Sequence, residues 1–210
     1  MRSEWKDTRT FFPLFIEHLN QDPTIETVVV VGAADGKFVL PLLRAGYSVT
    51  AIEVNNSAVH GYGDTRKGKA AERYSGGGLT AAAREVGLQD KLTIVNADVR
   101  TADIFPRDAL WTSCSWHYSL NHDQPLSRFF DAMKRCVRPG GILGAEYFMP
   151  VAPKHVETEH YLEQGEVWRY LQGWRRNWEA YTPVFVEAPH LGQPDVHVHR
   201  MGFFIATSSG

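Results

Sequence analysis

Cysteine is scarce in this sequence, with only Cys114 and Cys136 among 210 residues. Two cysteines cannot build a disulfide framework, and we interpret both as small core residues. The sequence also lacks an excess of charge of one sign. It contains 22 lysine and arginine residues and 24 aspartate and glutamate residues, so its formal net charge is −2. This balance argues against a dedicated polyanion-binding protein, which usually carries a strong positive footprint.

Long apolar runs are missing too. No segment approaches the roughly 20 apolar residues of a membrane-spanning helix, and Met1–Asp7 contains no apolar signal core. We therefore expect a soluble cytoplasmic protein. The chain is 43% hydrophobic and 22% charged, which is typical of a globular protein, and its length suits a single domain.

The sequence does contain a regular alternation of strand-like and helix-like segments. Val28–Val31 is a run of β-branched residues, typical of a strand that is buried on both faces. Further strands are predicted at 48–54, 92–95, 110–115 and 142–147. Apolar residues at helical spacing predict helices at 8–20, 38–46, 125–137 and 165–172. Such alternation indicates a parallel sheet with right-handed crossovers.

The C-terminal part breaks this alternation. Two strand-like runs, Trp178–Val186 and Val196–Ala206, have no helix between them. We expect them to form an antiparallel hairpin at the edge of the sheet. The predicted fold class is therefore α/β, a Rossmann-like doubly wound and mostly parallel sheet with a C-terminal antiparallel hairpin.

Ligands bind such sheets at the carboxyl ends of the strands. Gly32–Gly36 follows the first strand, Glu53 the second, Asp98 the third and Ser115–His122 the fourth. Glycine lets backbone approach a ligand closely, and an acid about 20 residues beyond it can hold the two ribose hydroxyls. Asp98 can accept a hydrogen bond from a purine amine, so the pattern predicts an adenosine site.

A dinucleotide is a poor candidate for the adenosine ligand. The G-x-G-x-x-G fingerprint would require glycine at three positions, where this chain has Gly32, Ala34 and Lys37. The G-x-x-x-x-G-K-[ST] phosphate loop does not occur in the sequence. These two departures argue against a pyrophosphate or nucleoside triphosphate site.

Four segments in this order resemble motifs of class I S-adenosylmethionine-dependent methyltransferases: Val28–Gly36, Val49–Glu53, Asn96–Asp98 and Arg138–Gly141. Within that class the tail looks most like the small tellurite-resistance-type methyltransferases, which share features matched here by Glu163–Glu166, Gly173–Trp174 and His199–Arg200. The sequence departs from the family at Val30, where an acid is common, and at Ala34, where a glycine is common.

The resemblance implies one methyltransferase domain over residues 1–210. Its parts would be an N-terminal helix or lid at 1–26, a cofactor-binding core at 27–147, and a C-terminal helix and hairpin at 148–210. Trp5, Phe11 and Phe12 would either close over the cofactor or pack on the sheet.

The resemblance also implies S-adenosylmethionine as the cofactor. The residues expected to bind it are Gly32, Ala33, Ala34, Asp35, Gly36, Glu53, Val54, Asp98, Val99, Ser115 and Trp116.

The acceptor pocket of this fold lies beside the end of the fourth strand. His117 is the candidate general base, because its ordinary pKa lies near physiological pH; the alternative is that it hydrogen-bonds loop backbone and shapes the wall of the pocket. Trp116 would give an aromatic wall suited to a planar or cationic acceptor. The residues expected to contact the acceptor are Trp116, His117, Tyr118, Asn121, His122 and Tyr147.

The predicted function is methyl transfer to the nitrogen, oxygen or sulfur atom of a small molecule. This in-line displacement depends mainly on positioning. Three alternatives stay open: an RNA or cap-like guanine methyltransferase, an NAD-dependent oxidoreductase, and an inactive cofactor-binding homologue. The first is suggested by the sequence His-Tyr-Ser at His117, which resembles a motif of messenger-RNA cap guanine-N7 methyltransferases. We expect a small-molecule substrate and neither nucleic acid nor a membrane as partner.

One further pattern lies near the end of the chain. Asp195, His197 and His199 would share one face of a strand, and such a set can bind iron or zinc. Because methyl transfer itself needs no metal, we expect the polar face of an edge strand here and no metal site.

Overall fold

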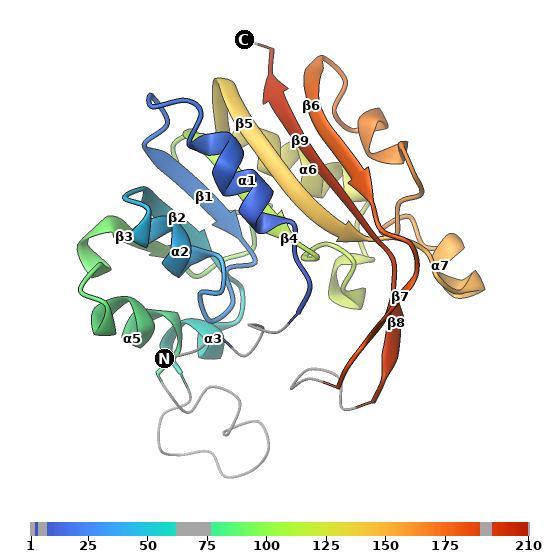
Figure 1. Ribbon diagram of the computed structural model, residues 1–210, viewed down its shortest axis with the longest axis horizontal. Coiled ribbons are helices and arrows are strands. Elements are labelled where there is room, and N and C mark those ends of the chain that lie inside the picture. Colours follow the sequence, from blue (N-terminus) through green and yellow to red (C-terminus); the bar gives the residue numbers. More distant parts are fainter. Residues whose placement is uncertain (1–2, 4–7, 62–76, 190–194, 210) are drawn as a thin grey trace.

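A computed structural model describes residues 3, 8–61, 77–189 and 195–209 of the chain (Figure 1). Its centre is a seven-stranded sheet in the order β3-β2-β1-β4-β5-β9-β6. The strands of this sheet are β1 Thr27–Val31, β2 Ser48–Ile52, β3 Leu92–Val95, β4 Arg107–Ser113, β5 Val137–Phe148, β6 Trp174–Tyr181 and β9 Met201–Ser208.

Helices cover both faces of the sheet. Figure 1 shows α1 in front of it and α6 behind it. The α-helices of the described residues are α1 Phe12–Leu19, α2 Val39–Arg44, α3 Asn56–His60, α5 Gly78–Glu85, α6 Leu126–Arg135 and α7 Pro153–Val156. Short 3-10 helices lie at Gln89–Lys91, Ser119–Asn121 and Glu166–Arg169. Within these ranges, no helix has both the length and the apolar character that crossing a membrane requires.

The valines of β1 explain the two layers. Val28 and Val30 point into the core cluster that contains α1, α2 and α5, whereas Val29 and Val31 point into the cluster that contains α6. Side chains alternate between the faces of a strand, so a strand buried on both faces must be apolar throughout. β1 pairs in parallel with β2 and with β4, which confirms the expected parallel core.

The C-terminal antiparallel pair is also confirmed, but the expected hairpin is divided between the main sheet and a separate ribbon. β9 pairs antiparallel with β5 on one side and with β6 on the other. The segments beyond them form a separate two-stranded ribbon, β7 Phe185–Glu187 with β8 His197–His199, which extends past the sheet in Figure 1. The helix expected at 165–172 is wrong in type, since only the single 3-10 turn Glu166–Arg169 forms there.

The N-terminal helix is packed on the sheet. Phe15 is fully buried, and Phe12 is 4% exposed and lies 5.1 Å from the Trp111 ring by centroid. Phe11 stacks on Phe203 with centroids 5.0 Å apart. These contacts favour the sheet-packing interpretation of Phe11 and Phe12, whereas Trp5 lies outside the described residues.

Candidate active site

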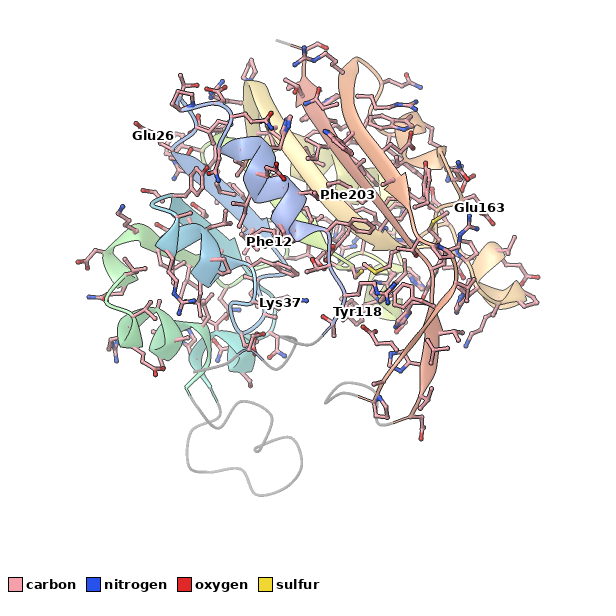
Figure 2. The ribbon with its side chains drawn as sticks, in the orientation of Figure 1. Phe12, Glu26, Lys37, Tyr118, Glu163 and Phe203 are labelled. Atoms are coloured by element: carbon pink, nitrogen blue, oxygen red, sulfur yellow. The ribbon has the colours of Figure 1, made fainter. Side chains whose placement is uncertain are left out.

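The carboxyl ends of the parallel strands open into a cleft of about 990 Å³. Figure 2 shows Lys37 and Tyr118 below the ends of β1 and β4. The predicted site residues that line the cleft are Gly32, Ala33, Ala34, Glu53, Val54, Asp98, Val99, Ser115, His117, Tyr118 and Asn121. Those that the structure places away from it are Asp35, Gly36, Trp116, His122 and Tyr147.

The loop after β1 needs unusual backbone angles. Gly32 has φ +71°, and a Cβ atom there would lie 3.0 Å from the Cβ of Ser115. Ala34 has φ +46°, a left-handed conformation that glycine adopts more easily. The backbone amide of Ala34 donates a hydrogen bond of 2.8 Å to the Glu53 carboxylate. This bond helps to hold the turn in a conformation that an alanine disfavours.

Glu53 lies at the end of β2 and is only 8% exposed. One carboxylate oxygen accepts from Ala34, and the other accepts from the amide of Asn55 at 2.8 Å. A carboxylate has about four lone-pair sites, so each oxygen can still accept from a hydroxyl group in the cleft. Val54 follows at 59% exposure and gives an apolar surface beside this carboxylate.

Asp98 is engaged by a neighbour that sequence reasoning missed. The Arg100 guanidinium lies 2.6 Å from one carboxylate oxygen, and its Nε donates to the other at 3.0 Å. These hydrogen bonds hold the pKa of Asp98 below its ordinary value. Arg100 also donates to the Oδ1 atom of Asn121, whose Nδ2 donates to the Ser115 carbonyl. Asn121 therefore ties two loops of the cleft together.

The aromatic wall predicted at Trp116 requires a correction. Trp116 is 1% exposed and packs between Phe130 and Tyr147, with centroid distances of 5.1 and 5.6 Å. Tyr147 is equally buried. Both side chains turn into the core cluster that α6 completes, so neither contacts the cleft.

The other three displaced residues have local reasons for their positions. Asp35 is 7% exposed and accepts a hydrogen bond from Ser3. A Cβ at Gly36 would lie 2.8 Å from Leu79, so the chain there approaches the core closely. His122 is exposed and its ring bonds the His117 carbonyl at 2.8 Å. His122 and Asp123 line a separate hollow.

His117 lines the cleft inside a cage of rings. Its centroid lies 4.3 Å from Tyr118, 4.5 Å from Phe148 and 5.8 Å from Tyr161. Burial, with a smaller contribution from His199, lowers the pKa of His117 to about 3. The imidazole is therefore neutral at physiological pH, and the aromatic wall is built by the rings around it instead of by Trp116.

Several lining residues come from parts of the chain that sequence reasoning did not connect with the site. His155 stacks on Tyr161 with centroids 4.3 Å apart. Lys37 donates hydrogen bonds to the carbonyl and hydroxyl of Thr8, and burial lowers its pKa. Glu187 reaches the cleft from β7. No local motif marks these residues, because they reach the cleft from separate parts of the chain: Lys37 follows the loop after β1, His155 lies on α7, and Glu187 lies on β7.

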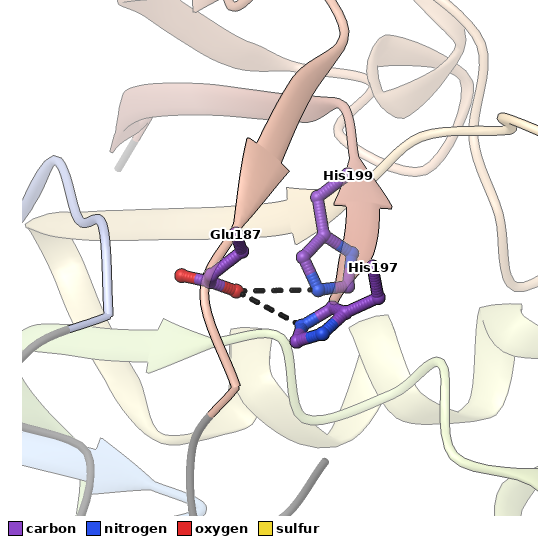
Figure 3. A group of neighbouring side chains, drawn as sticks. All are labelled: Glu187, His197 and His199. Carbon is purple, nitrogen blue, oxygen red and sulfur yellow. Dashed lines mark ion pairs between the residues drawn. The ribbon is translucent and has the colours of Figure 1, made fainter. Parts of the chain in front are cut away.

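The β7–β8 ribbon brings Glu187, His197 and His199 together at the cleft wall (Figure 3). Two ion-pair distances, 3.4 and 3.3 Å, join one Glu187 oxygen to the Nε2 atoms of His197 and His199. The predicted partner Asp195 has an exposed side chain and contributes only its backbone carbonyl, which bonds His197. The carboxylate of the cluster is thus Glu187, in place of Asp195.

No protein-family model matches this sequence, and no curated protein sequence matches it. Solved structures do match in fold. TehB from Haemophilus influenzae superposes with a TM-score of 0.68 at 13% identity, over 97% of this chain and 64% of that one. The chain thus spans less than two thirds of the length of TehB.

Two further solved structures match over similar shares of this chain. An S-adenosylmethionine-dependent methyltransferase from Methanosarcina mazei gives a TM-score of 0.63 at 18% identity, over 92% of this chain and 97% of that one. The 1,6-didemethyltoxoflavin N1-methyltransferase of Burkholderia thailandensis, with bound S-adenosylhomocysteine, gives 0.61 at 16% identity, over 95% of this chain and 76% of that one. The chain has the fold of S-adenosylmethionine-dependent methyltransferases.

Proposed function

We propose that this protein transfers a methyl group from S-adenosylmethionine to a small-molecule acceptor. The observation that carries the proposal is the arrangement of Gly32, Ala34, Glu53 and Val54 around one end of a single cleft. The fold supports the same assignment, because solved structures that share it include methyltransferases.

The residues present fit the nucleoside part of this cofactor. Glu53 presents carboxylate oxygens for the two ribose hydroxyls, and the exposed side of Val54 gives the adenine ring an apolar surface. Asp98 lies at the next strand end, where its oxygens are shared with Arg100, so we assign it a smaller part in binding than Glu53. The cofactor would supply a methyl group that its sulfonium already activates.

The acceptor end of the cleft is defined by aromatic and imidazole side chains. Tyr118, Phe148 and Tyr161 surround His117 and line the same space. The whole cleft, which also includes the proposed cofactor end at Gly32 and Glu53, has a volume of about 990 Å³, at the upper end of the range of small-molecule sites, and the cofactor would fill part of it. We therefore favour a small, partly apolar acceptor. The chain's net charge of −2 does not favour RNA.

His117 is proposed to position the acceptor. A general base works best when its pKa lies near the operating pH, and the pKa of His117 is about 3 because the ring is buried. A neutral imidazole still offers one hydrogen-bond donor and one acceptor. This side chain can therefore orient a polar acceptor group without taking its proton.

Calorimetry with three ligands tests the proposal. We expect binding of S-adenosylmethionine and S-adenosylhomocysteine at micromolar concentrations and none of NAD. Failure of both sulfur ligands to bind at millimolar concentration would overturn the proposal, and NAD binding alone would favour an oxidoreductase. If the cofactor binds, transfer of its labelled methyl group to a panel of metabolites, with RNA as a parallel substrate, identifies the acceptor class.

A further inference from the structure

We propose that Glu187, His197 and His199 bind a divalent first-row transition-metal ion at the acceptor end of the cleft. The β7–β8 ribbon builds the site, since its register places Glu187 directly opposite His197. His199 lies two residues further along β8 and so shares the same face. Figure 3 shows the two rings and the carboxylate converging on one point between the strands.

The spacing of the donor atoms fits a metal. Oε2 of Glu187 lies 3.4 Å from Nε2 of His197 and 3.3 Å from Nε2 of His199. Zinc–ligand bonds of about 2.1 Å at tetrahedral angles separate neighbouring donor atoms by about 3.4 Å. All three residues can present donor atoms within 4.8 Å of one another, so one ion can reach the set with small side-chain adjustments.

The surrounding contacts already orient the ligands. Nδ1 of His197 lies 2.8 Å from the Asp195 carbonyl, and a carbonyl oxygen only accepts, so Nδ1 carries the hydrogen. Its Nε2 therefore directs a lone pair at Glu187 when the ring is neutral. Such a hydrogen bond to the far nitrogen is the usual outer-shell support of a metal-binding histidine.

Neighbouring groups also hold the side chains of Glu187 and His199 in place. The backbone amide of Arg9 donates to Oε1 of Glu187 at 3.3 Å, which turns Oε2 toward the two rings. His199 stacks on Phe148 with centroids 4.1 Å apart and an angle of 8° between the rings. All three ligands thus have a neighbour that holds their direction before any ion binds.

A metal accounts for this arrangement better than ion pairing does. One Glu187 oxygen faces the Nε2 atoms of both His197 and His199. A single proton shared with one ring gives a favourable contact between that ring and the carboxylate, but leaves the other nitrogen lone pair facing the same oxygen. A cation bound by all three groups places positive charge between every pair of donors. Two nitrogens and one oxygen suit zinc, iron(II), cobalt or nickel. Three protein ligands also leave a coordination position open.

The open position would serve the acceptor, and this role rests on the proposed methyltransferase function. The three ligands line the same cleft as His117 and Tyr161. A hydroxyl or thiol acceptor bound to the ion would lose its proton to solvent more readily. The bond from the sulfonium sulfur to the methyl carbon then breaks as the bond from that carbon to the acceptor oxygen or sulfur forms. The site therefore predicts an oxygen or sulfur acceptor.

Metal titration of the full chain tests the site itself. Protein purified without a histidine tag is stripped with chelator and titrated with Co²⁺, followed by visible absorption, and with Zn²⁺, followed by calorimetry. We expect one equivalent to bind, with the intense bands of four-coordinate Co²⁺. Glu187→Gln and His197→Gln should each weaken binding at least tenfold. His155→Gln, which changes an imidazole of the same cleft outside the cluster, should leave it unchanged.

The outcomes separate this inference from the proposed function. Thermal unfolding of each metal-free variant checks that the chain still folds, and His197→Asn gives a second variant if His197→Gln does not. Absence of stoichiometric binding to the wild type, or equal binding by the ligand variants, overturns the metal site and leaves a cluster held by ion pairing with Glu187. Metal binding without S-adenosylhomocysteine binding supports the site and overturns the methyltransferase proposal. Binding of S-adenosylhomocysteine without metal binding supports the methyltransferase proposal and overturns the metal site.

Discussion

The Glu53 carboxylate accepts a hydrogen bond of 2.8 Å from the backbone amide of Ala34. One acid thus connects the ends of β1 and β2, which lie side by side in the sheet. The same carboxylate faces the cleft. In this way a residue proposed to bind ribose also holds the turn that is proposed to approach the cofactor, and its hydrogen bond to Ala34 supports an alanine at a left-handed position.

Replacing Glu53 with glutamine should weaken the binding of S-adenosylhomocysteine strongly. The amide keeps the size of the side chain but loses its charge and one acceptor oxygen. Hydrogen bonds to charged groups contribute about 1.5–3 kcal/mol each, so we expect an affinity loss of tenfold or more. Calorimetry measures it directly.

The matched control is Glu17→Gln, an exposed glutamate on α1 outside the cleft. This control should bind like the wild type, and thermal unfolding should show that both variants fold. Unchanged affinity in a folded Glu53→Gln variant would disprove the ribose assignment.

His117→Gln should lower turnover without changing the shape of the pH–rate profile. With a pKa of about 3, the wild-type imidazole is neutral from pH 5 to pH 9, so it contributes no titration there. Loss of one positioning hydrogen bond, about 1 kcal/mol, predicts a decrease in kcat of roughly five- to tenfold. Steady-state rates across this pH range test it. An acidic limb that is present in the wild type and absent in the variant would restore the general-base role.

The parallel core and the residues of the proposed cofactor end of the cleft could be predicted from the sequence, because their signals are local. The run of β-branched residues at Val28–Val31 predicts a buried strand. The spacing between Gly32 and Glu53 is that of one strand–helix–strand unit. Both features depend on residues close together in the chain. Sheet geometry then dictates that the strand ends meet at one edge.

The acceptor end could not be predicted in the same way. Whether Trp116 turns toward the cleft or toward α6 depends on the volume that Phe130 and Tyr147 leave open, which no local pattern encodes. Glu187 joins His197 only through the ribbon register. The hairpin itself was predictable, whereas its division into a sheet pair and a free ribbon was not.

Asp108→Asn should destabilise the protein in a pH-dependent manner. Asp108 accepts from Thr27 and from Arg138, and its pKa is held at about 2, below the ordinary 3.8. Because the folded pKa is the lower one, the stabilisation is fully present above about pH 5 and is lost as the pH falls toward 2. Linkage gives about 2 kcal/mol at pH 7.

Urea unfolding at pH 7 and pH 3 measures this difference. The Asp108→Asn variant should be less stable than the wild type at pH 7, and the gap should shrink at pH 3. Asp131→Asn, which breaks an exposed pair with Lys134, should cost less than about 0.5 kcal/mol at either pH. A gap that stays constant between the two pH values would contradict the assigned pKa.

Gly144→Ala should destabilise the fold by about 1–3 kcal/mol, the usual cost of overpacking a core. Gly144 lies in β5 under the N-terminal helix, and a Cβ there would lie 2.4 Å from Phe15 and 3.2 Å from Trp111. Both rings are fully buried, so neither can move aside into solvent.

Adding Phe15→Leu to Gly144→Ala should recover part of the lost stability, because the smaller side chain leaves room for the added methyl group. Urea unfolding of both single variants and the double variant measures this coupling. Strictly additive effects would show that α1 is not seated on Gly144.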